Sequence, residues 1–227
     1  TDINKIDTLD INVKDLVGKN AISKIMKYQY SYDQQFIGRY NYEYIDESSE
    51  KIFNRENIKK YSSKIDNILD SINNSNGPII VYSQFIDGGL IPMALALESI
   101  GFKRYGKSKS LLKNPPTEEL DIYTYKSKTD ALSSTGKFKP AKYIMITGDK
   151  ILSPDKNIDL NAVNNISNIN GHDIKVILLS SAGSEGLDFK FIRQVHILEP
   201  WYNINRLEQI IGRGVRTCSH KDLSFNE

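Results

Sequence analysis

Two arginines near the end of the chain have the type and spacing for phosphate chemistry. Arg213 and Arg216 are three residues apart in a segment with a helical pattern, so both side chains should point to the same side. Two guanidinium groups at one place repel each other unless an anion lies between them, and a triphosphate is such an anion. Arginine is also well suited to stabilise the charge that develops in phosphoryl transfer. The competing interpretation is a surface ion pair, for instance with Glu208.

A run of small residues precedes this arginine pair. It extends from Ser180 to Gly186 and is followed by Asp188. Small residues after a strand let the backbone come close to a phosphate or a nucleotide. A carboxylate such as that of Asp188 can accept hydrogen bonds from ribose hydroxyls. The segment therefore has the composition of a nucleotide-contacting loop.

The elements that must position these residues can be predicted from hydrophobic patterns. Apolar runs of the kind buried in parallel sheets alternate with segments of helical period. The predicted strands are 79–82, 143–146, 174–179 and 195–198, and the predicted helices are 58–72, 88–100, 159–169 and 203–215. This alternation predicts an α/β fold in which a parallel sheet is the middle of three layers. Most of the candidate residues follow the carboxyl ends of predicted strands. Open α/β sheets bind ligands at the edge where these carboxyl ends lie.

Three segments together resemble motifs IV, V and VI of superfamily 2 helicases. They are 79–85, 178–189, and 196–203 followed by 209–216. The pattern of Gln209, Gly212, Arg213 and Arg216 is the most specific, because it follows the second segment at a suitable distance. Residues 83–85 and 199–203 are similar to Snf2-type translocases, and the combination resembles the helicase-like transcription ATPases of large cytoplasmic DNA viruses, such as those of poxviruses. The resemblance covers 56–220 and implies a C-terminal RecA-like lobe, which is similar to P-loop NTPases.

The resemblance also implies roles for single residues. Arg213 and Arg216 would be arginine fingers that reach an ATP held by an N-terminal RecA-like lobe of the same polypeptide, and that lobe would also supply the Mg²⁺ ligands. Gln209 would contact the γ-phosphate or the attacking water. Gly186 and Asp188 would meet the edge of the nucleotide. The residues that would bind the backbone of DNA or RNA are Ser83, Gln84, Thr147, Gly148, Ser180 and Ser181.

Two departures from related groups bear on the nucleic acid. The second segment contains Gly186-Leu187-Asp188, where Snf2 proteins have an Arg-Ala-Gly-Gly arrangement, so both duplex DNA and a single strand remain open as the track. Gln209 stands at the position of the first arginine of the DEAD-box motif, which argues against a DEAD-box RNA helicase.

A competing motif lies at Gly101–Ser108, which formally matches a phosphate-binding loop. Such a loop needs a strand before its first glycine and a helix that begins at its lysine. Here a helical pattern precedes Gly101, so we expect this glycine to cap a helix and Phe102–Tyr105 to begin a strand. A self-contained NTPase is therefore the third hypothesis. The first hypothesis is the helicase lobe, and the second is a catalytically silent nucleic-acid-binding module of a transcription complex.

Composition limits the remaining function classes. The 227 residues carry a net charge of +2, so any contact with nucleic acid must be local. Cys218 is the only cysteine, which excludes a disulfide within the chain and a cysteine-based metal cluster. We expect no metal site in this chain. No apolar run approaches the roughly 20 residues of a membrane helix. The resemblance to viral transcription ATPases implies a cytoplasmic protein, in a viral factory or a virion if a virus encodes it, with transcription machinery among its partners.

Three segments lie outside the motif-bearing region. Residues 1–55 are expected to be a linker or peripheral segment, whose tyrosines between Tyr28 and Tyr44 form a strand pair or a packed loop rather than a base-stacking platform. Residues 103–142 are expected to be an insertion or long loop, solvated rather than bound to phosphates. Residues 221–227 are expected to begin a C-terminal extension of a longer protein.

Overall fold

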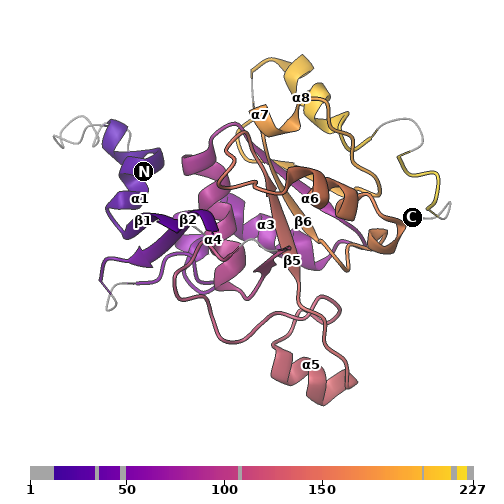
Figure 1. The fold of residues 1–227 in the computed structure, drawn as a ribbon, viewed down its shortest axis with the longest axis horizontal. Helices are drawn as coiled ribbons and strands as arrows, with labels where there is room; N and C mark the ends of the chain where they lie inside the picture. Colours follow the sequence, from indigo (N-terminus) through magenta and orange to yellow (C-terminus); the bar gives the residue numbers. More distant parts are fainter. Residues whose placement is uncertain are drawn as a thin grey trace.

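A five-stranded parallel sheet forms the centre of the computed structural model (Figure 1). The structure describes residues 13–33, 36–46, 50–106, 109–200, 202–215 and 219–223. The strand order is β4-β5-β6-β3-β7, and every pairing is parallel. The strands are β3 (Ile79–Ser83), β4 (Lys103–Arg104), β5 (Lys142–Ile146), β6 (Val176–Ser180) and β7 (Gln194–Ile197). The helical elements beside the sheet are α2 (Ile58–Tyr61), α3 (Ser63–Asn73), η3 (Ile86–Leu90), α4 (Ile91–Ser99), α5 (Lys128–Thr135), α6 (Lys156–Val163), η4 (Ile166–Asn168), α7 (Ser181–Ser184) and α8 (Ile204–Ile211).

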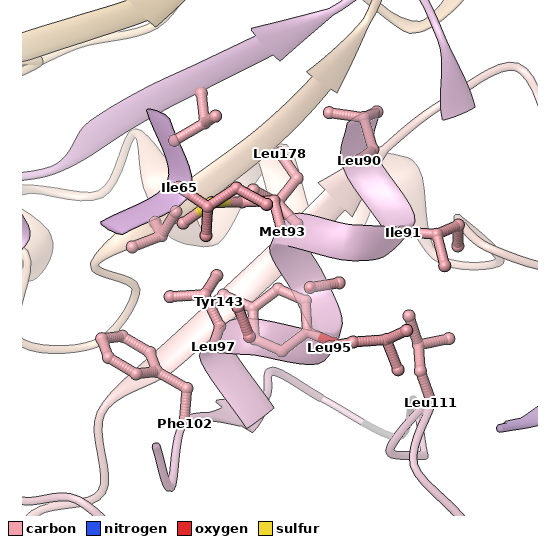
Figure 2. Close-up of a cluster of buried hydrophobic side chains, with 14 of the residues drawn as sticks. Ile65, Leu90, Ile91, Met93, Leu95, Leu97, Phe102, Leu111, Tyr143 and Leu178 are labelled. Carbon is pink, nitrogen blue, oxygen red and sulfur yellow. The ribbon is translucent and has the colours of Figure 1, made fainter. Parts of the chain in front are cut away.

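Each face of the sheet has its own hydrophobic core, because side chains alternate between faces along a strand. In β5, Tyr143 and Met145 join a cluster with α3 and α4, whereas Ile144 and Ile146 join a cluster with α6 and α8. Figure 2 shows the first cluster, where side chains of α4 lie among those of Tyr143 and the rest of the sheet. The predicted three-layer α/β fold is confirmed, and it is the RecA-like architecture.

The described residues between Val13 and Arg55 include a β-hairpin that packs on the core. After η2 (Val13–Leu16) and α1 (Gly18–Ser23), β1 (Met26–Asp33) pairs antiparallel with β2 (Phe36–Tyr44). Met26 and Tyr42 are buried in the same core as α4. The predicted tyrosine-rich strand pair is therefore confirmed. The backbone of Tyr42 also bonds to Leu111 and Lys113, so the hairpin is fastened to the segment after β4.

The described part of 103–142, which leaves out 107 and 108, contains β4 and α5. Figure 1 shows α5 beyond one end of the sheet, on the opposite side from α7 and α8. The buried carboxylate of Asp121 organises the turn before α5, because it accepts hydrogen bonds from Tyr123, Thr124 and Lys139. Burial raises the pKa of Asp121, but these donors outweigh that effect and the pKa lies below its usual value.

Several predicted helices differ in extent from the observed ones. The stripe over 58–72 is two helices, because the Ser62 hydroxyl accepts a 3.3 Å hydrogen bond from the Ile65 N–H and begins α3. The predicted helix 159–169 is wrong in its bounds, since α6 ends at Val163 and η4 follows. The predicted helix 203–215 was too long, because α8 ends at Ile211 before two glycines.

The structure also decides against the phosphate-binding loop at 101–108. A helix, α4, precedes Gly101, and the glycine has φ +99° while its N–H bonds back to the Glu98 carbonyl. A strand, β4, follows it. Lys107 and Ser108 lie outside the described residues. The order is helix, glycine and strand, the reverse of what a phosphate-binding loop needs, so Gly101 is a helix cap as predicted.

None of the described helices has the length and apolar character needed to cross a bilayer.

Candidate functional site

The predicted nucleic-acid contacts gather at the carboxyl edge of the sheet. Ser83 ends β3 and is the register partner of Ser180, which ends β6. Thr147 follows Ile146, the last residue of β5, whose register partner is Leu179. The short helix α7 begins directly after Ser180, and Figure 1 shows it together with α8 at this edge. The fold therefore brings these segments together, as the sequence predicted.

Three hydroxyls at this edge are buried and bonded within the protein. The Ser83 Oγ donates to Glu199 Oε2 at 2.7 Å and accepts from the Phe85 N–H. Ser180 accepts from the Gly183 N–H, which caps α7. Their contact with a nucleic acid stays a prediction, and in this structure the hydroxyls position the loops.

Thr147 is the third of these residues, and its partner is Ser153. The Thr147 N–H donates to Ser153 Oγ at 2.8 Å, and the two hydroxyls lie 3.1 Å apart. Ser153 in turn donates to the Met145 carbonyl. Sequence reasoning missed Ser153, because no local pattern shows that the chain turns back onto the end of β5.

Two glycines allow the loops to approach one another closely. A Cβ on Gly89 would lie 2.1 Å from Ser83 Oγ and 2.9 Å from Glu199 Oε1. A Cβ on Gly183 would lie 2.1 Å from the Ile146 carbonyl oxygen. These glycines serve packing inside the protein. Gly186 differs, because its φ is +68° and nothing lies within 4 Å of the Cβ position, so it has room for a ligand.

A cavity of about 730 Å³ opens at the same edge. Its lining includes Gly148, Lys150 and Lys156 from the loop after β5 and the start of α6, and Ala182 from α7. A Cβ on Gly148 would lie 3.0 Å from that of Ala182, so the two loops touch. The Lys156 ammonium donates to the Gly183 carbonyl at 3.0 Å, whereas Lys150 is exposed. Small residues and lysines beside a cavity can accommodate a phosphodiester backbone.

The second and third motif segments are joined through Arg213. Its carbonyl oxygen accepts a 3.0 Å hydrogen bond from the Phe189 N–H, and its Nη1 lies 3.5 Å from the Leu187 carbonyl oxygen. Arg213 lies two residues beyond the end of α8, in a turn that includes Gly212 and Gly214. The expected placement of Arg213 on a helix was wrong. Arg216 falls outside the described residues.

The surroundings of Arg213 fit an anion. The side chain is partly buried, and no carboxylate within the described ranges forms an ion pair with it, Glu208 included. Gly186, Asp188 and Gln209 are exposed. A partly buried guanidinium with no neighbouring carboxylate favours binding of a negatively charged group.

Asn164 holds the loop that carries Asp188. Its Nδ2 donates to the Asp188 carbonyl at 2.9 Å, and its Oδ1 accepts from the Lys190 N–H at 2.8 Å. The residue follows α6 and lies far from the motif in the sequence, so only the fold reveals it. Lys64 of α3 holds the segment that carries Glu199 in the same way, because its ammonium donates to the carbonyl of the preceding residue, Leu198.

Two titratable side chains near this edge have shifted pKa values. Burial raises the pKa of Asp87 in η3, and the neighbouring Asp149 raises it further while Lys19 opposes the shift. Burial lowers the pKa of His196 in β7, where its Nε2 lies 3.0 Å from Gln194 Oε1. His196 is thus a neutral histidine with a partner in the sheet, in agreement with a structural role. Over the described ranges, no three His, Cys, Asp or Glu side chains form a group that could hold a metal ion.

Comparison with known proteins relates this chain to helicases. The family model described as helicase conserved C-terminal domain matches residues 124–218. The chain is 34% identical over 173 residues to a protein of African swine fever virus named termination factor NPH-I homolog, which covers 73% of this chain and 24% of the relative. It is 36% identical over 171 residues to a putative ATP-dependent RNA helicase of Acanthamoeba polyphaga mimivirus, covering 74% of this chain and 25% of the relative. A putative helicase of Invertebrate iridescent virus 3 is 32% identical over 176 residues, which are 76% of this chain and 15% of that protein.

Proposed function

Because residues 124–218 match the helicase conserved C-terminal domain, we propose that this chain is the C-terminal RecA-like lobe of a superfamily 2 nucleic-acid-dependent ATPase. The chain spans about a quarter of the length of the viral relatives named first, for instance 24% of the African swine fever virus protein. An N-terminal lobe of the same polypeptide would bind ATP and Mg²⁺. The resulting motor would move along or separate DNA or RNA strands.

The observation that carries this proposal is the position of Arg213. Its backbone is tied to Phe189, next to the exposed Gly186–Asp188 loop, and its guanidinium has no ion pair with a described carboxylate. These contacts support a role for this guanidinium in anion binding, because no carboxylate among the described residues neutralises its charge. A triphosphate bound by a facing lobe would supply the negative charge.

The proposed nucleotide contacts follow from exposure and chemistry. Arg213, and by its place in the motif Arg216, would bind the phosphates and stabilise charge that develops on them. The exposed Gln209 would orient the attacking water or the γ-phosphate. Asp188 would accept hydrogen bonds from the ribose, and Gly186 would let the nucleotide edge come close. Bound Mg²⁺ would neutralise charge on the β- and γ-phosphates.

The proposed nucleic-acid track runs over the cavity between Gly148 and Ala182. Lys150 would contact a phosphate of the strand, and the amide groups near Gly148 and Ser181 would donate to neighbouring phosphates. Gln84 is partly exposed at the end of β3 and would extend this track. Movement of Ser180–Asp188 would couple the strand to the nucleotide, because the same short segment borders both sites.

The experiment that tests the proposal measures ATP hydrolysis by the complete polypeptide. Single-stranded RNA, single-stranded DNA and duplex DNA are added separately, at fixed salt. At least one of them should stimulate hydrolysis, whereas this chain alone should hydrolyse almost no ATP. Nucleic-acid binding without any hydrolysis would contradict the proposal and favour the catalytically silent module.

The proposed setting is viral transcription in the cytoplasm. It is supported by a relative from African swine fever virus whose name is termination factor NPH-I homolog. Under this proposal the motor acts together with transcription machinery.

A further inference from the structure

A second polar cavity lies at the opposite edge of the sheet from the proposed ATPase site. Its volume is about 550 Å³. It is lined by residues that precede β3 and β6 and by the turn before α5: Asn73, Ser75, Asn76, Ile122, Tyr123, Thr124, Tyr125, Asn170, His172 and Lys175. These residues lie at the amino ends of strands, so the cavity cannot be part of the carboxyl-edge site.

Lys175 is the most informative residue of this cavity. It is 3% exposed, and its ammonium donates to the Ser75 carbonyl at 2.6 Å. An ammonium has three N–H donors, and the described residues offer no carboxylate within ion-pair distance of this one. Burial lowers the pKa of Lys175, the positive charge of Arg193 adds to this effect, and together they bring it to about 8. A buried lysine next to another cation and without a carboxylate favours an anion in the cavity.

Tyr125 provides a second unused polar group. Its hydroxyl is buried and has no hydrogen-bond partner among the residues that the structure describes, while the Lys175 ammonium lies 5.9 Å from the centre of its ring. The backbone of Tyr125 has φ +53°, which is uncommon for a residue with a side chain. The turn keeps this conformation because the buried Asp121 accepts hydrogen bonds from neighbouring backbone N–H groups and its carbonyl accepts from the Tyr125 N–H.

The rim of the cavity has groups suited to a planar, hydrogen-bonding ligand. Tyr123 is 52% exposed, and its ring packs edge-on against that of His172 with centroids 4.7 Å apart. Burial and the nearby Lys139 and Lys175 lower the pKa of His172 although Asp173 opposes the shift, which favours the neutral imidazole. The amide side chains of Asn73, Asn76 and Asn170 complete the rim. Aromatic rings stack on bases, and amides hydrogen-bond to base edges and ribose.

We propose that this cavity binds a nucleoside monophosphate group, with its phosphate on Lys175 and the Tyr125 hydroxyl and its base against Tyr123. The group can be a free nucleotide or the phosphorylated end of an RNA strand, because both present the same chemistry. The size of the cavity lies in the range of small-molecule sites, which is roughly 300–1,000 Å³. The site is independent of the ATP and track contacts proposed above.

Titration calorimetry of this chain tests the proposal with five probes. They are AMP, adenosine, inorganic phosphate, and a hexaribonucleotide with and without a 5′-phosphate. AMP or the phosphorylated strand should bind more tightly than adenosine, inorganic phosphate and the unphosphorylated strand. The tighter of these two ligands shows whether the cavity prefers a free nucleotide or the phosphorylated end of an RNA strand. An acidic peptide of glutamates serves as the competing class of ligand.

Variants locate the binding. Lys175→Met and Tyr125→Phe should each weaken binding, the former by about 10-fold or more because it removes a charge-assisted hydrogen bond. Tyr123→Ala should weaken AMP binding but leave that of inorganic phosphate unchanged. Lys126→Met is the matched control, since this lysine is exposed and does not line the cavity. Unchanged AMP affinity in both Lys175→Met and Tyr125→Phe, absence of AMP and strand binding, or preference for the acidic peptide would overturn the proposal.

Discussion

The Phe189 N–H donates a 3.0 Å hydrogen bond to the Arg213 carbonyl oxygen. This bond joins a loop that follows β6 to the turn that follows α8. The two segments carry the glycine–aspartate and arginine parts of the proposed nucleotide site. A displacement of one loop is therefore transmitted to the other through the main chain.

Gly89 and Gly88 form a matched pair for testing the packing of the site. Gly89→Ala should destabilise the protein by about 1–3 kcal/mol, because its Cβ would overlap the buried side chain of Ser83. Gly88→Ala should change stability little, since its Cβ would meet only ordinary contacts at 3.7–3.8 Å. Urea unfolding of the two variants measures the difference. Equal stability in both would mean that the close contact with Ser83 and Glu199 is absent in solution.

Glu98 is expected to be a major determinant of stability. The carboxylate is 1% exposed and accepts hydrogen bonds from the N–H groups of Leu111 and Leu112 and from the Tyr143 hydroxyl. Glu98→Ala leaves several buried donors unpaired, which should cost on the order of 4 kcal/mol. Chemical denaturation is the measurement, and Glu118→Ala on the exposed surface is the control. A loss below about 1 kcal/mol would contradict the buried network.

Lys175 should make stability depend on pH above neutrality. Its folded pKa of about 8 lies below the ordinary value of 10.5, so the unfolded chain binds more protons between these limits. Stability from this residue should therefore rise as the pH increases from about 8 to 10.5. The shift corresponds to roughly 3 kcal/mol, because one pKa unit is about 1.4 kcal/mol.

Lys175→Met removes this group and tests its contribution. The variant should be at least as stable as the wild type at pH 7, because it no longer buries a charge. Its thermal stability should also lack the rise between pH 8 and 10.5 that the wild type shows. If the thermal stability of the wild type and of the variant rose equally over this pH range, the pH dependence would come from groups other than Lys175.

Lys150 should affect nucleic-acid binding through one phosphate contact. Lys150→Gln should weaken binding to all sequences and reduce the slope of log K against log salt by about 1. Binding of the complete polypeptide at several salt concentrations gives this slope. Lys128→Gln on α5, beyond the opposite end of the sheet, is the control. An unchanged slope for Lys150→Gln would contradict the proposal that the nucleic-acid strand passes over this cavity.

The sheet could be predicted from the sequence because its strands are apolar on both faces. Ile79–Val81 and Tyr143–Ile146 have no polar residue, which is the pattern of buried parallel strands. The helix bounds were less accurate, since Ser62 begins a new helix and the turn at Gly212 stops α8 early. The start of α3 and the end of α8 each depend on a single residue, and the preference of one residue for a helix end is weak without tertiary contacts.

The motifs of the site were found from sequence, but the inner partners of their residues were not. Ser83 is predicted to contact a nucleic acid, but the hydrogen bond from its hydroxyl to Glu199 could not be predicted from the sequence. Buried charges were also missed, because a carboxylate such as Glu98 becomes stable in the core only through distant partners such as Tyr143. No local pattern records such long-range contacts.

The most direct test of the account is the turnover of an Arg213 variant. In the complete polypeptide, Arg213→Ala should lower the kcat of nucleic-acid-stimulated ATP hydrolysis on the order of 10³-fold or more. Affinity for the nucleic acid should stay unchanged, because Arg213 is proposed to contact the nucleotide and not the strand. Arg55→Ala, which removes a surface ion pair with Asp66, is the control and should keep full turnover. Turnover of Arg213→Ala equal to that of the wild type would contradict the assignment of this residue as an arginine finger.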